Sequence, residues 1–172
     1  AGWAGGLWCA RLSRAGVPLD SVFVDSLYVP QATQVVSAWA SDLLGPALVA
    51  DPAGWFVAWG QTILYDQPRQ VLAARLDSLG VRVDPAGILV GEADALRGRP
   101  DVATSGDQHL VVWAGETIAD NRVDVYAARV SVNGTVLDAP PIRITNDAAG
   151  ETHPRVVFDG VLVGGQRAAE ID

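Results

Sequence analysis

One twelve-residue segment occurs three times in this chain, and it constrains the fold more than any other feature. Residues Ala73–Asp84 recur as Ala127–Asp138 and, in a more divergent form, as Cys9–Asp20. Each copy has two short runs of alternating residues around a dipeptide that ends in Gly. Asn133-Gly134, in the clearest copy, is the strongest short-range signal for a two-residue β-hairpin turn. The sequence therefore predicts three β-hairpins of the same kind.

A two-residue turn sets a register that accounts for both faces of each hairpin. The apolar pairs are then Leu76 with Val83, Val130 with Leu137, and Leu12 with Leu19. The charged pairs on the other face are Arg75 with Asp84, Arg129 with Asp138, and Arg11 with Asp20. Such cross-strand pairs stabilise antiparallel strands, and their agreement in all three copies supports the prediction.

The hairpins belong to a longer repeat of 54 residues. Pro46, Pro100 and Pro154 have this spacing, and so do Trp59 and Trp113. The period divides one repeat domain, residues 1–172, into four parts. These are a partial unit at 1–45 with an insertion at 28–45, two full repeats at 46–99 and 100–153, and a partial unit at 154–172.

Each full repeat contains four segments that are typical of strands. The first begins at Pro (46–50, 100–103, 154–158) and precedes a tight turn (51–54, 105–107, 159–160). The second follows (55–59, 109–113), the third ends in Ala-Ala-Arg, and the fourth covers 81–90 or 135–145. The only candidate helix is 34–44. Four antiparallel strands at this period predict an all-β fold of β-propeller-type blades.

Four motifs of the second full repeat resemble tandem repeats of secreted or surface proteins of bacteria. They are Pro100-Asp101-Val102-Ala103, Leu110-Val111-Val112-Trp113, Tyr126-Ala127-Ala128-Arg129-Val130 and Gly134-Thr135-Val136-Leu137-Asp138. The resemblance covers residues 46–158 well. It implies a propeller scaffold outside the cytoplasm and does not imply one function. The use of Arg without any Lys also suits a bacterial genome rich in GC.

The number of blades is the difficulty with this interpretation. Closed propellers usually contain about four to eight blades, and only three repeat phases fit in this chain. Three explanations remain open: an incomplete propeller cut from a longer protein, which we favour, an open arc of stacked blades, or several copies that together complete a ring. In each case open blade edges favour self-association.

The overall charge and hydropathy exclude some partners. A net charge of −8 without a basic patch argues against nucleic acid and anionic membrane surfaces. No apolar run approaches the length of a transmembrane helix. Cys9 is the only cysteine, so no internal disulfide can form, and Ala stands at its position in the other copies. We therefore interpret Cys9 as a small buried strand residue.

The tryptophans fall into two groups. Trp59 and Trp113 recur at one phase and are predicted to fill the space between blades. Trp39 and Trp55 are not repeated, which makes them the better candidates for exposed aromatic contacts with a ligand, carbohydrate included.

The segment between the second and third strands supplies the other candidate binding residues. They are Asp66, Glu116, Asp120, Asn121 and Asp124. Asp120, Asn121 and Asp124 offer oxygen ligands of the kind that Ca²⁺ takes, but the spacing is not that of an EF-hand and Gln70 replaces Asp124 in the other repeat. The alternative, which we favour, is a solvated loop whose side chains cap their own backbone.

No catalytic constellation emerges from the sequence. His109 and His153 lie at different phases without further metal ligands nearby, and the Gly-x-Ser-x-Gly motif is absent. Asp84 and Asp138 already have arginine partners, which suits them poorly to act as general acids. We therefore expect a non-enzymatic scaffold or binding module for a protein or glycan, without a cofactor. The alternative is a fragment of a propeller enzyme, such as a glycoside hydrolase or a propeller-associated peptidase.

Overall fold

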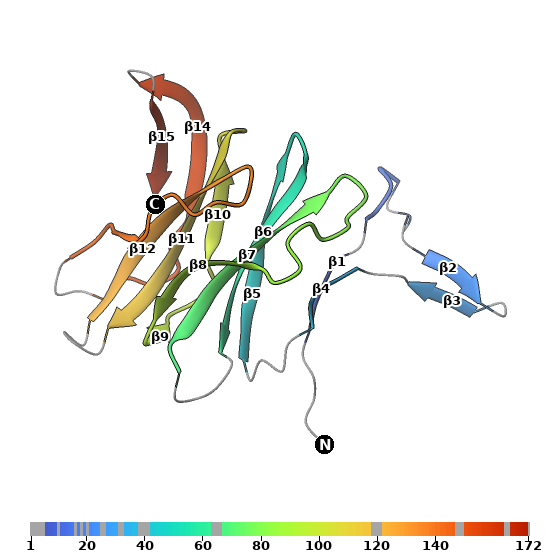
Figure 1. Cartoon of the computed structure of the whole chain (residues 1–172), viewed down its shortest axis with the longest axis horizontal. Coiled ribbons are helices and arrows are strands. Elements are labelled where there is room, and N and C mark those ends of the chain that lie inside the picture. Colours follow the sequence, from blue (N-terminus) through green and yellow to red (C-terminus); the bar gives the residue numbers. More distant parts are fainter. Residues whose placement is uncertain are drawn as a thin grey trace.

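All the regular structure that the computed structural model describes is β-strand, and every paired strand is antiparallel (Figure 1). The described residues are 6–9, 11–15, 17, 19, 21–24, 27–30, 33–37, 42–62, 67–117, 122–146, 150–163 and 166–171. The all-β prediction is confirmed. In this part of the chain, no helix is long and apolar enough to cross a membrane.

Two sheets form the centre of the molecule. The first sheet has the order β5 (Asp42–Asp51), β6 (Gly54–Thr62), β7 (Arg69–Asp77) and β8 (Ile88–Ala93). The second sheet has the order β10 (Asp101–Thr104), β11 (Gln108–Thr117), β12 (Arg122–Ser131) and β13 (Ile142–Arg143), and β9 (Ala95–Leu96) also pairs with β11.

The pairing register repeats with the sequence period. Between the first two strands, Ala47 lies opposite Ala58 and Asp101 lies opposite Val112. The remaining pairs agree in the same way: Trp55 with Leu76 and His109 with Val130, then Ala73 with Ile88 and Ala127 with Ile142. Every one of these pairs moves by the same 54 residues, so the sequence repeat is also a structural repeat.

The fourth strand begins later than the sequence predicts. β8 begins at Ile88 and β13 at Ile142, whereas strands were expected from residues 81 and 135. Pro85 explains the delay in the first sheet, because proline has no N–H to donate to a strand ladder. Between the turn and the fourth strand, the backbone pairing with the third strand is an isolated bridge in each sheet: Leu76 with Arg82, and Val130 with Val136.

Three further strand pairs lie outside the two central sheets. They are β1 (Gly6–Cys9) with β4 (Thr33–Ser37), β2 (Ser21–Val24) with β3 (Leu27–Pro30), and β14 (Val156–Val163) with β15 (Gln166–Ile171). β4 and β5 occupy the described parts of 34–44, so the candidate helix was wrong. The run Val35-Val36 explains this, since β-branched residues favour strands.

The turn expected at 159–160 was also wrong, because both residues lie within β14. The register of β14 against β15 is irregular between Phe158 and Leu162, and Gly160 has a φ of 79°. A glycine in this conformation lets the strand bulge and continue where a turn was expected.

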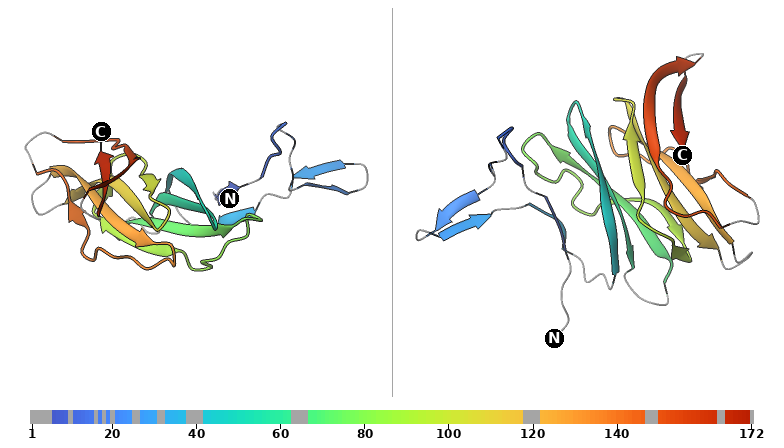
Figure 2. Two further views of the ribbon diagram at one scale, coloured as in Figure 1. Left: turned by 90° about the horizontal axis from the view of Figure 1, so that it is seen from above. Right: turned by 180° about the vertical axis from the view of Figure 1, so that it is seen from behind.

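The first and second sheets pack face to face around the main core (Figures 1 and 2). The first sheet contributes Phe56, Ala58, Val71, Ala73, Ile88 and Val90, and the second contributes Val111, Trp113, Ala128 and Val130. The other face of the second sheet packs its Ala103, Val112 and Ala127 against β14, and the other face of the first sheet carries Val57, Trp59, Ala74 and Leu76. Both sheets are therefore apolar on both faces, as inner layers of a stack must be.

Two glycines allow the sheets to approach closely. A Cβ atom on Gly91 of β8 would lie 2.6 Å from Cζ2 of Trp113, and one on Gly60 of β6 would lie 2.8 Å from Cδ1 of Leu96. Trp113 therefore fills the space between the sheets, as predicted. Trp59 is buried on the opposite face of the first sheet.

We predict that Gly91→Ala lowers the free energy of unfolding by about 1–3 kcal/mol, the usual cost of overpacking a core. Gly45→Ala is the matched control, because a Cβ there would meet only Cδ of Arg99 at 3.9 Å. Urea denaturation of the two variants and the parent gives the comparison. Equal stability of the two variants would show that Trp113 can move away from Gly91 at no cost.

Candidate functional site

The repeated hairpins use a three-residue loop, so the predicted two-residue turn is wrong by one position. Leu76 lies opposite Arg82 and not opposite Val83. The backbone N–H of Asp77 donates to the carbonyl of Val81 at 2.9 Å, and Gly80 has a φ of 79°. A type I turn followed by a left-handed glycine is the common three-residue hairpin.

The other two hairpins are built in the same way. Val130 lies opposite Val136, and Gly134 has a φ of 84°. In the first copy Ser13 N–H donates to the carbonyl of Val17 at 2.7 Å, as Asp77 does to Val81. Three hairpins of one kind are therefore present, as the sequence predicts, although their loop is one residue longer.

The arginine and aspartate of each described pair are in contact. Asp84 accepts hydrogen bonds from the backbone N–H of Arg75 at 2.8 Å, from Nε at 3.0 Å and from Nη2 at 2.6 Å. Asp138 accepts the same three bonds from Arg129, at 2.8, 2.9 and 2.7 Å. Asp20, the partner expected for Arg11, lies outside the described residues.

These contacts determine the protonation of the two carboxyl groups. Burial alone would raise the pKa of Asp84, but the hydrogen bonds and charge of Arg75 outweigh burial and lower it. The hydrogen bond from Arg129 likewise lowers the pKa of Asp138. Both groups are carboxylates at neutral pH, which makes them structural anions and not proton donors.

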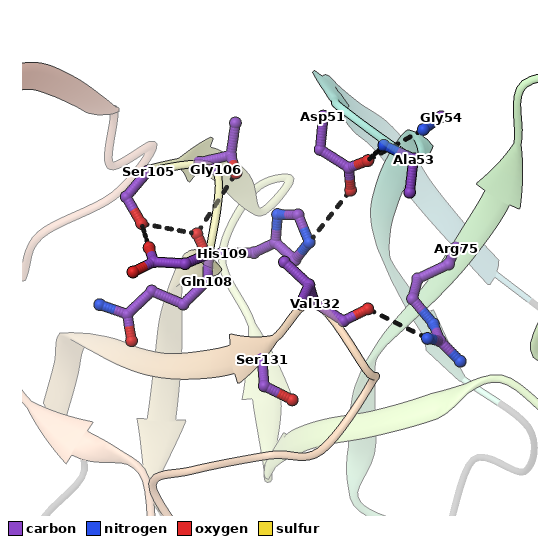
Figure 3. A network of polar contacts seen from close by, with 12 residues as sticks. Asp51, Ala53, Gly54, Arg75, Ser105, Gly106, Gln108, His109, Ser131 and Val132 are labelled. Carbon is purple, nitrogen blue, oxygen red and sulfur yellow. Dashed lines mark hydrogen bonds and ion pairs between the residues drawn. The ribbon is translucent and has the colours of Figure 1, made fainter.

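Each of the first two arginines also reaches the turn of the following hairpin. Arg75 Nη1 donates to the carbonyl of Val132 at 3.0 Å (Figure 3), and a Cβ atom on Gly134 would lie 3.2 Å from Cζ of Arg75. Arg11 has the same place above the earlier turn, with its Cδ 3.7 Å from where a Cβ of Gly80 would be. We call this arrangement the inter-repeat arginine contact.

A buried histidine forms a second polar contact between the sheets. His109 of β11 is fully buried, and its ring stacks on Phe56 of β6 with 4.0 Å between centroids. Its Nε2 lies 3.4 Å from Oδ2 of Asp51 (Figure 3), but this contact is too poorly aligned to satisfy either ring nitrogen with a hydrogen bond. Burial lowers the pKa of His109, although Asp51 opposes the shift, so the ring is neutral at pH 7.

Asp51 is held in place by its own turn. Its Oδ1 accepts the backbone N–H groups of Ala53 and Gly54, at 2.7 and 2.9 Å (Figure 3). His109 stands at the repeat position of Trp55, so an interface role could be inferred from the sequence. The contact of Asp51 with His109 could not be inferred from the sequence, because it depends on the geometry of the turn in the preceding repeat.

The structure describes only three of the predicted site residues: Trp55, Glu116 and Asp124. Trp55 is half-buried in β6 and packs against the cluster of Val57, Trp59, Ala74 and Leu76. Glu116 lies in β11 and Asp124 in β12, so these two are strand residues and not loop residues. The remaining candidates, Trp39, Asp66, Asp120 and Asn121, lie outside the described residues.

Glu116 and Asp124 each form an ion pair with an arginine that the sequence analysis missed. Arg97 Nε donates to Oε2 of Glu116 at 2.9 Å. Arg143 Nη2 donates to Oδ2 of Asp124, whose side chain is fully buried. Neither arginine lies in the segment from which the loop was inferred, and no spacing rule connects them to their partners. Across the described ranges, no three His, Cys, Asp or Glu side chains group closely enough to hold a metal ion.

The two sheets differ in polarity at the end near Asp124. In the first sheet the indole Nε1 of Trp59 donates to Oε1 of Gln61 at 3.3 Å. In the second sheet Gly115 takes the position of Gln61. Trp113 Nε1 and Asp124 Oδ1 are buried there without a hydrogen-bond partner among the described residues. The replacement of Gln61 by Gly115 is the sequence signal that marks this difference.

Comparisons with protein-family models, with curated proteins and with solved structures found no match to this chain. The described polar side chains therefore have to be interpreted from their own geometry. Most of the charged groups named here are engaged in contacts that hold strands or sheets together.

We predict that Arg75→Ala destabilises the chain more than Arg129→Ala. The side chain of Arg75 is 24% exposed and bonds to two hairpins, so its loss should cost about 1.5–3 kcal/mol. The side chain of Arg129 is 46% exposed, and its loss should cost about 0–1 kcal/mol. Urea denaturation at low protein concentration measures both. The reverse order would refute the inter-repeat arginine contact.

We also predict that His109 makes the stability pH-dependent. Because its pKa is lower in the folded chain, the unfolded chain binds more protons just below about pH 6.5. The free energy of unfolding should therefore fall as the pH decreases through this window. The pKa of the nearby Arg75 is raised by its hydrogen bonds to Asp84, so Arg75 stays charged throughout this window. The lowered pKa values of Asp84 and Asp138 act in a more acidic window, below about pH 4.

His109→Leu should remove the loss of stability between about pH 6.5 and 5. His153→Asn is the control, because His153 is exposed and Asn tolerates its positive φ of 59°. Thermal unfolding across this pH range distinguishes the variants. An unchanged pH dependence in His109→Leu would contradict the prediction.

Proposed function

We propose that the chain is a non-enzymatic scaffold of β-propeller type that works outside the cytoplasm and binds a protein or glycan. The observation that carries this proposal is the matching register of two four-strand paths, β5–β8 and β10–β13, combined with the face-to-face packing of their sheets. A path of four antiparallel strands is also the content of a propeller blade, and β9 adds a fifth strand to the second sheet. The first strands of the two sheets, β5 and β10, also lie beside each other, as the inner strands of neighbouring blades do.

The described charges support a scaffold role. Glu116, Asp124, Asp84 and Asp138 are all ion-paired with arginines of the same chain. Such groups hold the strands and sheets in place, and the lowered pKa values of Asp84 and Asp138 make these two poorly suited to donate protons. Rigid stacking of this kind suits a surface that presents variable loops to a ligand.

The connections between second and third strands are where we expect the ligand to bind. Because β6–β7 and β11–β12 share one register, both connections leave their sheets at equivalent positions. Their sequences nevertheless differ: Ile63-Leu64-Tyr65-Asp66 in one repeat and Ile118-Ala119-Asp120-Asn121 in the other. Variation at a fixed position of a repeated scaffold is typical of binding loops.

Affinity electrophoresis tests whether the chain binds a glycan, in gels that each contain one soluble bacterial or plant polysaccharide. We expect at least one polysaccharide to retard the chain, and the double variant Asp120→Ala/Asn121→Ala to lose this retardation. Asp107→Ala/Asn133→Ala is the matched control, since it makes the same chemical change at the opposite end of the second sheet. Retardation that survives in the first variant contradicts the proposed loop site, and shortening of the polysaccharide favours the enzyme alternative.

A further inference from the structure

A side-chain amide links two polar side chains across the first sheet. Trp59 Nε1 donates to Oε1 of Gln61 at 3.3 Å, and Gln61 Nε2 donates to Oε1 of Gln70 at 3.4 Å. Gln61 lies opposite Gln70 in the ladder and two residues after Trp59, so all three side chains lie on one face of the sheet. The amide of Gln61 therefore accepts one hydrogen bond from the indole and donates one to an oxygen.

The second sheet keeps both ends of this link but lacks its middle. Trp113 and Asp124 stand at the repeat positions of the indole donor and the final acceptor, and Gly115 stands at the position of the bridging glutamine. Oδ2 of Asp124 accepts from Arg143, whereas Trp113 Nε1 and Asp124 Oδ1 have no hydrogen-bond partner among the described residues. The side chain of Asp124 is fully buried and Trp113 is 1% exposed. Buried polar groups of this kind are costly unless they are bridged.

The surroundings of Gly115 leave no room for a longer side chain at this position. A Cβ atom there would lie 3.0 Å from Cβ of Ala93 and 3.4 Å from Cδ2 of Tyr126. The same point lies 3.5 Å from Nε1 of Trp113. Gly115 lies opposite Asp124 in the ladder, so the side chain of Asp124 is on this face too. A donor and an acceptor therefore border the space over Gly115.

We propose that one water molecule is bound over Gly115, between Trp113 and Asp124. Its oxygen accepts the hydrogen bond of Trp113 Nε1, and one of its protons is donated to Oδ1 of Asp124. Water is the smallest molecule that both accepts and donates, as the amide of Gln61 does in the first sheet. Buried waters typically bridge polar groups that have no protein partner.

This water fixes the ends of two strands. Gly115 lies two residues before the end of β11, and Asp124 lies two residues after the start of β12. These strand ends carry the connection at which we expect the ligand to bind, although the water needs no ligand there. Because a water can exchange, the second sheet has a replaceable link where the first has a covalently attached one.

Nuclear magnetic resonance of the ¹⁵N-labelled chain tests the proposal on the unchanged sequence. The indole N–H signals are assigned by the loss of one signal in Trp113→Phe and of another in Trp59→Phe. We expect a nuclear Overhauser effect between the N–H of Trp113 and the water resonance, with the sign of a long-lived bound water. We expect none for Trp59, whose N–H is bonded to Gln61. A rotating-frame experiment separates this effect from proton exchange, which has the opposite sign.

Two further variants identify the source and the place of the signal. A tyrosine hydroxyl proton also resonates with water and Tyr126 borders the space, so Tyr126→Phe should keep the effect. The double variant Ala93→Gly/Gly115→Gln makes room for an amide and supplies it, and Ala93→Gly alone is its matched control. We expect the double variant to lose the water effect and to show one between the N–H of Trp113 and the introduced amide. The control should keep the water effect.

Three results would overturn the proposal. The first is an N–H of Trp113 without a water effect, as a direct bond to Asp124 would give. The second is an effect that is lost in Tyr126→Phe or is equally strong at Trp59. The third is a water effect that persists in the double variant, because the water would then lie elsewhere than over Gly115.

Discussion

The ion pair of Arg75 with Asp84 is the contact on which both the hairpin and the stack depend. Asp84 accepts the backbone N–H of Arg75, so its carboxylate continues the strand ladder at the point where Pro85 approaches. The same carboxylate neutralises the guanidinium, which can then lie between two sheets. An unpaired guanidinium in that place would carry a large desolvation cost. Local pairing within one repeat is thus the condition for the bond that Arg75 makes to Val132 in the next.

Much of the fold could be predicted from the sequence because the repeat restates each strand with the same spacing. The errors occurred where one spacing fits two geometries. A two-residue turn and a three-residue turn both bring Arg75 near Asp84, and both accept a left-handed glycine at Gly80. The pairing of Leu76 with Arg82 distinguishes them, and the sequence does not encode it. The prediction of a turn at 159–160 was wrong for a related reason, since a glycine with positive φ, such as Gly160, is found in bulges as well as in turns.

The candidate site was harder to predict than the fold. The polar composition of 114–124 resembles a loop, yet the ladder continues through Thr117 and resumes at Arg122. What makes Glu116 and Asp124 compatible with strands is their pairing with Arg97 and Arg143, which come from other parts of the second sheet. Such pairs follow from three-dimensional packing, and a single sequence carries no local sign of them.

Ile88 and Ile142 differ in exposure although they hold the same position in the repeat. The two residues are identical and hold the same register position, but only Ile88 is covered by a following turn. Their different exposure therefore comes from stacking and not from the residue itself. The second sheet keeps Ile142 at the contact position although no described residues cover it. This is the property expected of a unit that is made to stack. This explains why both faces of each central sheet are apolar and why its charges are neutralised within the repeat.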